Sequence, residues 1–389
     1  MSHNDYLRKR YNYMQPVLQK INKRFISLEK WEVKRNNTIL KHVMQPLIKK
    51  MRKMNPLFKA LFSEPYYGGS FYDGLKVGKP EEFDVDLLLT LHEDTEPEVI
   101  VSNIPGYIHI RLRGYEDFMK TSSRKWRQLH YLIDNRYYLD ATKVLAWMQK
   151  VIRKAFNKFP MCADGTAIFN TSYGQFKGKI RRGGPAYTLE LSGRASGKSV
   201  FLSIDLVSSF VFSEDRWPLS PFCPNPIKYM PDFFVVPKKP SENGNYRRYW
   251  RLSFQCQEAE LIKGKEGLKP TIRLLKKLQE KLGKEVVSSY YIKTIFLWEI
   301  HERSESFWRN SLSYLFITML RRYKWYLRRY GIPYYWNKRN NLLNANCITI
   351  QNLGNRLQHI ISDIENNPHD LNIVARHILS PNELNQLRL

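Results

Sequence analysis

The sequence predicts an α+β protein of two lobes, in which a mixed-sheet lobe with long N-terminal helices precedes an all-helical C-terminal lobe. Three observations predict this class. Residues 1–60 carry apolar side chains at helical spacing, residues 70–91 have the pattern of strands, and helical spacing returns beyond residue 251. A chain of 389 residues is long enough for two hydrophobic cores. We expect the lobes to comprise residues 1–235 and 236–389.

The N-terminal segment is predicted to form amphipathic helices. Ile39, Val43, Leu47 and Met51 recur every four residues, which places them on one apolar helix face. Residues 1–60 also contain fifteen Lys and Arg against three Asp and Glu, so the opposite face is densely cationic. Because proline lacks a backbone N–H, Pro46 is expected to start or kink a helix.

The middle of the chain is predicted to form the sheet, and the rest to form helices. Phe83, Val85, Leu87 and Leu89 occupy every second position, the period of a pleated strand. Further elements are predicted as a helix over 138–156, strands over 185–191 and 200–212, and a Pro-rich crossing between the lobes over 218–240. The C-terminal helices are predicted over residues 271–282, 288–301, 308–330 and 353–366.

The charge balance indicates an anionic partner. Sixty-three Lys and Arg against thirty-six Asp and Glu leave a formal net charge of +27. Such a surplus repels itself unless a partner neutralises it, so we expect nucleic acid, nucleotide polyphosphate or acidic lipid.

The cysteines and the N-terminus bear on metal and compartment. Cys162, Cys223, Cys256 and Cys347 are scattered without a CxxC spacing, which argues against a zinc ribbon or a disulfide framework. The first ten residues are polar and basic, and no window approaches the ~20 apolar residues of a membrane span. A cytoplasmic location is therefore expected.

The most informative pattern is a Gly-Ser pair followed by closely spaced carboxylates. Gly69 and Ser70 precede Glu82, Asp84 and Asp86, which share one face of the predicted strand. Crowded carboxylates repel one another, and a divalent cation removes that cost. The backbone around a glycine can approach a phosphate closely, and a serine adds a hydroxyl donor. The pattern therefore favours Mg²⁺ or Mn²⁺ with a nucleoside triphosphate, although the role of Asp86 stays open.

A third carboxylate is expected from a neighbouring strand. Asp205 lies inside an apolar run over residues 200–207, where burying a charge is costly without a cation. Two metal ions about 3.5–4 Å apart could activate an attacking hydroxyl and stabilise the leaving pyrophosphate. The alternatives are a solvated acidic strand face, a simple Gly-Ser turn, and a salt bridge between Asp205 and an arginine.

These residues resemble the signature of cyclic GMP–AMP synthase (cGAS) and the animal cGAS-like receptors, of the Mab-type nucleotidyltransferase family. The likeness continues in further blocks of the chain. These blocks are residues 141–152, residues 184–189 (GPAYTL) with 203–205 (SID), and, in the expected helical lobe, residues 250–254 (WRLSF) and 288–294 (SSYYIKT). Together the blocks span residues ~30 to 345 in the order of the family.

The resemblance implies a bilobed nucleotidyltransferase fold and a role for each matching residue. Glu82, Asp84 and Asp205 would be catalytic and bind the metal pair. The implied nucleotide-binding residues are Gly69 and Ser70 at the donor triphosphate, Arg251 and Ser253 at the acceptor base, Lys276 at a phosphate, and Tyr290 with Ser289 at a stacked base. The implied activity is synthesis of cyclic GMP–AMP from ATP and GTP in innate immune signalling, after nucleic acid binds.

The chain departs from cGAS where that enzyme carries a zinc-binding thumb. Residues 255–267 are too few, and Cys256 is their only cysteine. No zinc is therefore expected, and the resemblance shifts toward thumbless receptors, some of which sense double-stranded RNA. We expect double-stranded RNA as the activator, with DNA less favoured, and the active chain could pair along the nucleic acid.

A cationic surface is predicted to hold the duplex. Its expected residues are Lys30, Lys34, Arg35, Lys41, Lys49, Lys53, Lys269 and Arg273. Contacts of this kind neutralise phosphates without reading sequence, and duplex RNA is recognised mainly by its shape and backbone. A second run over residues 321–329 mixes cations with aromatics, and could bind nucleic acid or pack as an amphipathic helix.

Two alternative functions stay open on the sequence. One is a catalytically inactive nucleotidyltransferase-fold protein that binds nucleic acid or acts as a scaffold. The other is a linear oligoadenylate synthetase, which shares the two-metal chemistry. The phosphodiester linkage and the base order of a cyclic product are also left open.

Overall fold

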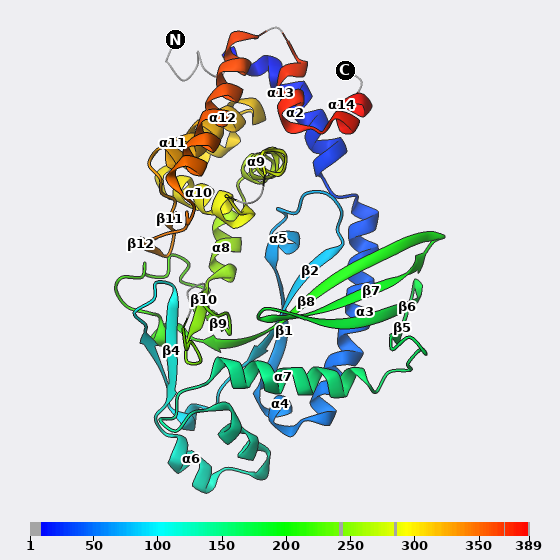
Figure 1. Ribbon diagram of the computed structural model, residues 1–389, viewed down its shortest axis with the longest axis vertical. Coiled ribbons are helices and arrows are strands. Elements are labelled where there is room, and N and C mark those ends of the chain that lie inside the picture. Colours follow the sequence, from blue (N-terminus) through cyan, green and yellow to red (C-terminus); the bar gives the residue numbers. More distant parts are fainter. Residues whose placement is uncertain (1–8, 241–243, 284–285, 369, 388–389) are drawn as a thin grey trace.

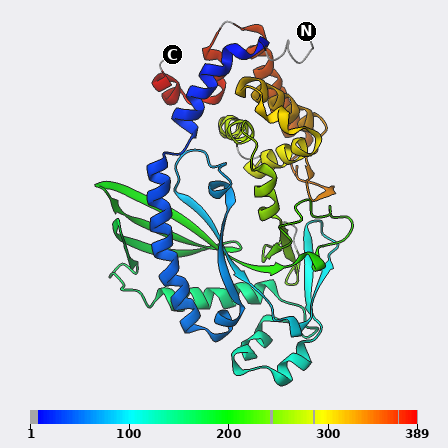
Figure 2. The same ribbon diagram turned by 180° about the vertical axis from the view of Figure 1, so that it is seen from behind.

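The computed structural model describes residues 9–240, 244–283, 286–368 and 370–387. A sheet lobe and a helical lobe lie at opposite ends of the longest axis of the molecule (Figure 1), as the sequence predicts. The long helix α3 (Lys30–Met54) runs from the helical lobe down along the sheet lobe, as the reverse view also shows (Figure 2).

A ten-stranded sheet organises the lower lobe. Its strands are β1 (Phe62–Gly68), β2 (Glu82–Leu89), β3 (Pro97–Val101), β4 (Tyr107–Leu112), β5 (Ala167–Thr171), β6 (Gly174–Gly183), β7 (Ala186–Ala195), β8 (Lys198–Phe212), β9 (Phe233–Val236) and β10 (Trp250–Ser253). The main path runs β3-β4-β10-β9-β8-β7-β6-β5, and β2 joins β8 to β1. The pairing of β2 with β8 is parallel, whereas the other pairings are antiparallel.

Short helices complete the sheet lobe. They are α4 (Pro56–Leu61), α5 (Gly69–Tyr72), η3 (Glu93–Thr95), α6 (Tyr115–Thr121), η4 (Arg124–Leu132), α7 (Ala141–Phe156) and η5 (Glu214–Arg216). The side chain of Asp140 starts α7 by accepting from the backbone N–H groups of Thr142 and Lys143, at 2.8 and 3.0 Å.

The helical lobe contains segments from both ends of the chain. Its elements are η1 (Asn12–Met14), α2 (Gln15–Ile21), the π-helical turn η2 (Asn22–Ile26), α8 (Gln255–Ile262), α9 (Leu268–Leu282), α10 (Ser289–Glu302), η6 (Glu305–Arg309), α11 (Leu312–Arg328), α12 (Cys347–Asn366), α13 (Asn372–Ile378), α14 (Pro381–Leu387) and the hairpin of β11 (Pro333–Tyr334) and β12 (Asn337–Asn341). α2 packs against α11 and α13. In the described ranges, no helix combines the length and apolar character needed to cross a membrane.

α3 forms where the apolar pattern predicts it. Ile39, Val43, Leu47 and Met51 are all fully buried, and the helix packs against α7 and β5. Pro46 was expected to start or kink a helix, and the first of these alternatives is wrong, because Pro46 lies inside α3. Proline costs this helix one backbone hydrogen bond, and burial of the long apolar face offsets that loss.

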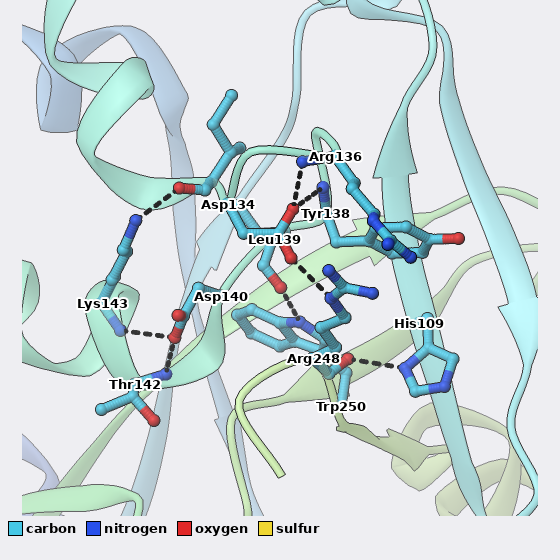
Figure 3. Close-up of polar contacts among 11 residues, drawn as sticks. His109, Asp134, Arg136, Tyr138, Leu139, Asp140, Thr142, Lys143, Arg248 and Trp250 are labelled. Carbon is cyan, nitrogen blue, oxygen red and sulfur yellow. Dashed lines mark hydrogen bonds and ion pairs between the residues drawn. The ribbon is translucent and has the colours of Figure 1, made fainter. Parts of the chain in front are cut away.

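A group of polar contacts attaches β10 to the sheet lobe (Figure 3). Trp250 is fully buried, and its indole Nε1 donates to the carbonyl of Leu139 at 3.0 Å. Arg248 forms an ion pair with Asp134, and its carbonyl accepts from His109 Nδ1 at 3.0 Å. These contacts fix the strand that carries Arg251, a residue predicted to bind nucleotide.

The placement of the WRLSF block in the helical lobe is wrong. Residues 250–253 form β10, which pairs with β4 and β9 in the large sheet. Four residues are too few to show a strand period, so their structure depends on the strands beside them. The division of the chain between residues 235 and 236 stays a prediction, and β10 follows that point while belonging to the sheet.

Candidate active site

Two aspartates lie side by side at the centre of the large sheet. The parallel register of β2 and β8 places Asp84 opposite Asp205, and Glu82 opposite Ser203. The hydroxyl of Thr188 on β7 donates to Asp205 Oδ1 at 2.6 Å, which orients that carboxylate. Two of the three carboxylates predicted to share a site are therefore adjacent.

The surroundings make Asp84 difficult to ionise. Asp84 is exposed to the cavity, yet desolvation by the surrounding protein raises its pKa to about 6, and repulsion from Asp205 and then Asp86 adds to the increase. The Asp84 side chain nevertheless lines an open cavity. A divalent cation would remove the repulsion between the two aspartates, and carboxylate oxygens are the ligands that Mg²⁺ prefers. The donor set therefore fits such an ion.

Glu82 has a different partner in this structure. Lys76 forms an ion pair with it, and its ammonium donates to a Glu82 carboxylate oxygen. The side chain of Glu82 is 73% exposed. Across the described ranges, no three His, Cys, Asp or Glu side chains are gathered closely enough to hold a metal ion. Lys76 thus supplies the positive charge at Glu82, and a third ligand would require that ion pair to open.

Asp86 is built into the protein interior. Its carboxylate accepts from the hydroxyl of Ser209 and from Gln255 Nε2, the latter at 2.7 Å. Burial raises its pKa, while these two hydrogen bonds oppose the increase. Because both oxygens are occupied, Asp86 joins β2 to β8 and α8, and its role is structural.

Gly69 brings the backbone into direct contact with Asp84. Its φ of +73° lies in the left-handed region, and a Cβ there would stand 1.8 Å from Asp84 Oδ2. Only glycine fits this position without displacing the carboxylate. Ser70 follows at once in α5 and lines the same cavity.

A cavity of about 440 Å³ lies between the lobes next to the aspartates. The predicted site residues that line it are Gly69, Ser70, Asp84, Arg251, Ser253, Lys276, Ser289 and Tyr290. A neighbouring cavity of about 350 Å³ shares Ser70, Lys276 and Ser289 with it and is also lined by Glu82. All seven residues predicted to bind nucleotide therefore line one cavity, although they come from both lobes.

Arg251 reaches the cavity from β10 between two tyrosines. Its guanidinium lies 5.3 Å from the ring centre of Tyr107 and 5.4 Å from that of Tyr334. These cation–π contacts hold the flat guanidinium in place. Its unused N–H donors can then recognise a base edge.

A buried ionic group forms part of the cavity wall, and sequence reasoning did not find it. Lys293 Nζ lies 2.7 Å from Asp73 Oδ2 and 2.9 Å from Glu258 Oε2. The Tyr290 hydroxyl donates to Glu258 Oε1 at 2.8 Å, and burial raises the pKa of Tyr290 well above its ordinary value. Asp73 ends α5, so this group links the Gly-Ser segment to α8 and α10. The nearness of Asp73 to Ser70, and of Lys293 to Tyr290, was the available sequence signal.

Lys276 is a half-buried cation at the edge of the cavity. Its ammonium donates to the carbonyl of Leu75 at 2.6 Å. Burial lowers the pKa of Lys276 to about 8, and repulsion from Lys76 contributes to the decrease. A phosphate beside this side chain would restore its charged form, because an anion offsets both effects.

The predicted cationic surface is only partly assembled. Lys30, Lys34, Lys41, Lys49 and Lys53 are exposed along α3. A groove of about 1000 Å³ is lined by Lys41, Lys49 and Lys53 together with Arg52 and Lys59, two cations that sequence reasoning missed. The groove therefore brings five cations onto one face of α3 and α4.

Three of the predicted cations contact other parts of the protein. Arg35 is 7% exposed, lies over the ring of Trp31 and donates to Asn36. Arg273 donates to the carbonyl of Gly74 at 3.1 Å. Lys269 also packs against Gly74, since a Cβ at that glycine would stand 3.4 Å from its ammonium. Arg35 therefore stabilises α3, and the α9 pair contacts the loop after α5.

Two domains of known proteins match the chain, and the matches meet at residues 264–267. The Mab-21 protein nucleotidyltransferase domain matches residues 71–264, and the Mab-21 protein HhH/H2TH-like domain matches residues 267–361. The first match contains Glu82, Asp84, Asp205 and β10. The second begins just before α9.

Relatives match over almost the whole chain. A cyclic GMP-AMP synthase-like receptor from Tribolium castaneum is 43% identical over 376 residues, covering 95% of this chain and 93% of the relative. A protein of the same name from Aethina tumida is 40% identical over 379 residues, covering 96% and 93%. A cyclic GMP-AMP synthase-like protein from Drosophila melanogaster is 23% identical over 343 residues, covering 86% and 87%.

Proposed function

The chain belongs to the Mab-21 nucleotidyltransferase family, with the insect cyclic GMP–AMP synthase-like receptors, and from this membership we propose that it is a nucleic-acid-activated cyclic dinucleotide synthase. Its substrates are ATP and GTP, its product is cyclic GMP–AMP, and its activator is double-stranded RNA. The product serves as a signal in innate immunity. Two copies pairing on one duplex are compatible with this proposal.

One observation carries the proposal. Asp84 and Asp205 are adjacent on parallel strands, and the Gly69 backbone touches Asp84 at the mouth of the cavity that Ser70 lines. This arrangement suits a triphosphate held beside a cation site. Asp84 and Asp205 would hold Mg²⁺ or Mn²⁺, with Glu82 as the third ligand once it leaves Lys76. Such ions, when bound, activate the attacking hydroxyl and stabilise the leaving pyrophosphate.

The other side chains position the nucleotides. Arg251, held by its two tyrosines, and Ser253 beside it on β10 would recognise the acceptor base. Tyr290 offers a ring for stacking, fixed through its hydroxyl by Glu258. Lys276, with its lowered pKa, would bind a phosphate. Because these residues come from both lobes, substrate binding would draw the lobes together.

The cationic groove supports a duplex activator. Five cations around α3 and α4 offer phosphate contacts that ignore sequence. α3 also contacts the segment before β2, since Asn36 Nδ2 donates to the carbonyl of Pro80 at 2.7 Å. A duplex on α3 could therefore influence the catalytic segment, residues 69–84, which contains Gly69, Ser70, Glu82 and Asp84. The region after β10 forms α8 in place of a zinc thumb, which favours RNA over DNA.

A product assay tests the reaction and the activator together. Purified protein is incubated with labelled ATP, GTP and Mg²⁺, and with duplex RNA, duplex DNA or neither. The catalytic variant is Glu82→Ala/Asp84→Ala. The matched control is Glu93→Ala/Asp94→Ala, which removes one glutamate and one aspartate from exposed positions in the same lobe. We expect a cyclic dinucleotide only with duplex RNA, lost in the catalytic variant and retained in the control.

Other outcomes would identify a different function. Activation by DNA alone would keep the reaction and change the activator. A ladder of linear oligomers would indicate an oligoadenylate synthetase. Duplex binding without any product, in a protein whose melting temperature is normal, would overturn the enzymatic proposal in favour of a scaffold.

A further inference from the structure

A separate cavity, of about 510 Å³, lies in the helical lobe. It is formed by the C-terminal ends of α10 and α11 and by the β11–β12 hairpin, which lie together in Figure 1. It shares no lining residue with the cavity beside Asp84. Its volume falls within the range of about 300–1,000 Å³ typical of small-molecule sites.

The cavity carries positive charge that no carboxylate of the described residues neutralises. Arg329, Lys338 and Arg339 line it, and among the described residues none of the three forms an ion pair with an acidic side chain. Glu302 is the acidic residue of the lining, but its carboxylate accepts from Arg322 Nη2 at 3.0 Å. Three uncompensated cations around one hollow attract an anion.

Aromatic rings form the other part of the wall. The Arg329 guanidinium lies over the indole of Trp325, 3.9 Å from its ring centre. Lys338 Nζ lies 5.2 Å from the ring centre of Trp298, whose Nε1 donates to the carbonyl of Pro333 at 2.8 Å. Flat rings and guanidinium groups are the surfaces on which nucleic-acid bases stack.

Tyr330 adds a ring at an unusual backbone position. It follows the end of α11 with a φ of +51°, a conformation that favours glycine. Its side chain is nonetheless 42% exposed and lines the cavity. The glycine of this segment, Gly331, comes one residue later, so the left-handed position itself is occupied by Tyr330. Strain of this kind is often kept where a side chain has a task.

We propose that this cavity is a second nucleotide-binding site, distinct from the proposed catalytic one. A base stacks against the aromatic and guanidinium wall, and the phosphates contact Arg329, Lys338 and Arg339. The ligand is a purine nucleotide, either a free triphosphate or a cyclic dinucleotide. The hairpin connects this cavity to the one beside Asp84, because Pro333 lines this cavity and Tyr334 lines the cavity beside Asp84. A ligand bound here could therefore influence the cavity beside Asp84. Binding here does not depend on catalysis.

Photolabelling tests this proposal on the full chain. Protein is labelled with 8-azido-ATP without added metal, and the modified peptides are mapped by mass spectrometry. Competitors are ATP, a cyclic dinucleotide and a short single-stranded RNA. The test variant is Arg329→Ala/Lys338→Ala/Arg339→Ala. The matched control is Arg124→Ala/Lys125→Ala/Arg127→Ala, which removes the same residue types from exposed positions on η4.

We expect label within residues 298–333 or 338–341, a range that omits Tyr334 of the cavity beside Asp84, and we expect ATP or the cyclic dinucleotide to displace it. The amount of that label should be at least about tenfold lower in the test variant than in wild type, since the variant lacks three charge-assisted contacts. Label in the cavity beside Asp84 should persist, which shows that the variant is folded, and the control variant should match wild type. The proposal is overturned if residues 298–333 and 338–341 stay unlabelled, or if the test variant labels normally there. Displacement by single-stranded RNA but by neither nucleotide would also overturn it, in favour of a nucleic-acid contact.

Discussion

At the scale of single residues, Asp84 is the carboxyl group of the proposed catalytic site whose ionisation its neighbours oppose. Burial, then repulsion from Asp205, raises its pKa to about 6 from an ordinary value of 3.8. Because the folded pKa is the higher one, the contribution of this group to stability is full below pH 3.8. That contribution is lost as the pH rises through about 6. Above this pH the ionised pair is the state that a cation can stabilise.

The first prediction follows from this sign. Mg²⁺ should raise the melting temperature clearly at pH 7.5 and little at pH 5, since a proton on Asp84 competes with the metal ion. Asp84→Asn should remove most of the Mg²⁺ effect and, without metal, should match or exceed wild type in melting temperature at pH 7.5. Thermal unfolding at both pH values, with exposed Asp94→Asn as control, measures this. An equal Mg²⁺ effect at both pH values would contradict a site at Asp84.

Gly69 provides a second prediction at the scale of one residue. Gly69→Ala adds a Cβ 1.8 Å from Asp84 Oδ2, in addition to the cost of a left-handed alanine. Gly78 also has a positive φ, yet a Cβ there meets nothing within 4 Å. Gly78→Ala should therefore cost about 1 kcal/mol of stability and leave product formation close to wild type. Gly69→Ala should reduce product formation at least about a hundredfold, because the carboxylate must move.

Comparing the two alanine variants separates backbone strain from the contact with Asp84. Product rate and urea unfolding are measured for each. If both variants lose product formation equally, strain in the segment explains the loss, and the close approach to Asp84 has no special role.

Residue types at the site could be predicted from the sequence, but some of their partners could not. The spacing of Glu82 and Asp84, and the apolar run around Asp205, were sufficient to predict that these carboxylates come from adjacent strands. The ion pair of Lys76 with Glu82 was not predicted. Lys76 lies in a loop without periodicity, where the path of the chain depends on contacts with distant elements.

At the scale of elements, α3 is joined to the catalytic segment by two asparagines. Asn36 donates to the carbonyl of Pro80, and Asn37 Oδ1 accepts from the Tyr72 hydroxyl at 2.7 Å. Tyr72 belongs to α5, two residues after Ser70. These contacts connect the cationic helix to both ends of the loop between α5 and β2.

The third prediction concerns this connection and depends on the proposed activation by RNA. Tyr72→Phe and Asn37→Ala each remove one hydrogen bond, which corresponds to about 1 kcal/mol or about fivefold. We expect RNA-stimulated product formation to fall by about that factor, while RNA affinity stays unchanged. Thr38→Ala is the control, because its hydroxyl bonds only within α3, to the carbonyl of Lys34. Loss of RNA affinity in parallel with activity would indicate a damaged helix rather than a lost connection.

The elements that were predicted are those with a clear period. β2, β8, α7 and α9 to α12 fall close to the expected ranges. β6 was missed because its side chains are exposed at most positions, so no apolar alternation marks it. β9 lies in the Pro-rich crossing and β10 is only four residues long, so their pairing partners decide their structure.

At the scale of the whole molecule, the 63 Lys and Arg are not equally available to an anionic partner. Some of them are paired within the protein. In the run over residues 321–329, Arg321 pairs with Glu365, and Arg322 with Glu299 and Glu302. Lys324 donates to Gln358 at 2.7 Å. These contacts support packing as the role of Arg321, Arg322 and Lys324, so the groove along α3 is the better candidate for the duplex.

The last prediction tests the groove through its salt dependence. Lys41→Glu/Lys49→Glu/Lys53→Glu removes three of the cations that line it. If each contacts one phosphate, the slope of log affinity against log salt should become shallower by about 2 to 3. Affinity for duplex RNA near physiological salt should also fall at least about a hundredfold, since each substitution also adds a repelling charge. Fluorescence anisotropy with labelled duplex RNA across a salt series measures both quantities.

The matched comparison is Arg124→Glu/Lys125→Glu/Arg127→Glu on η4, which changes the net charge by the same amount. Long-range attraction depends on net charge, so both variants should lose some affinity at low salt. Only contacts made by the groove itself change the slope, because the slope counts the counterions released at the bound surface. A shallower slope in the α3 variant alone therefore places the duplex on the groove. Equal slopes in the two variants would mean that RNA binds elsewhere, and that the proposed route from α3 to the catalytic segment is wrong.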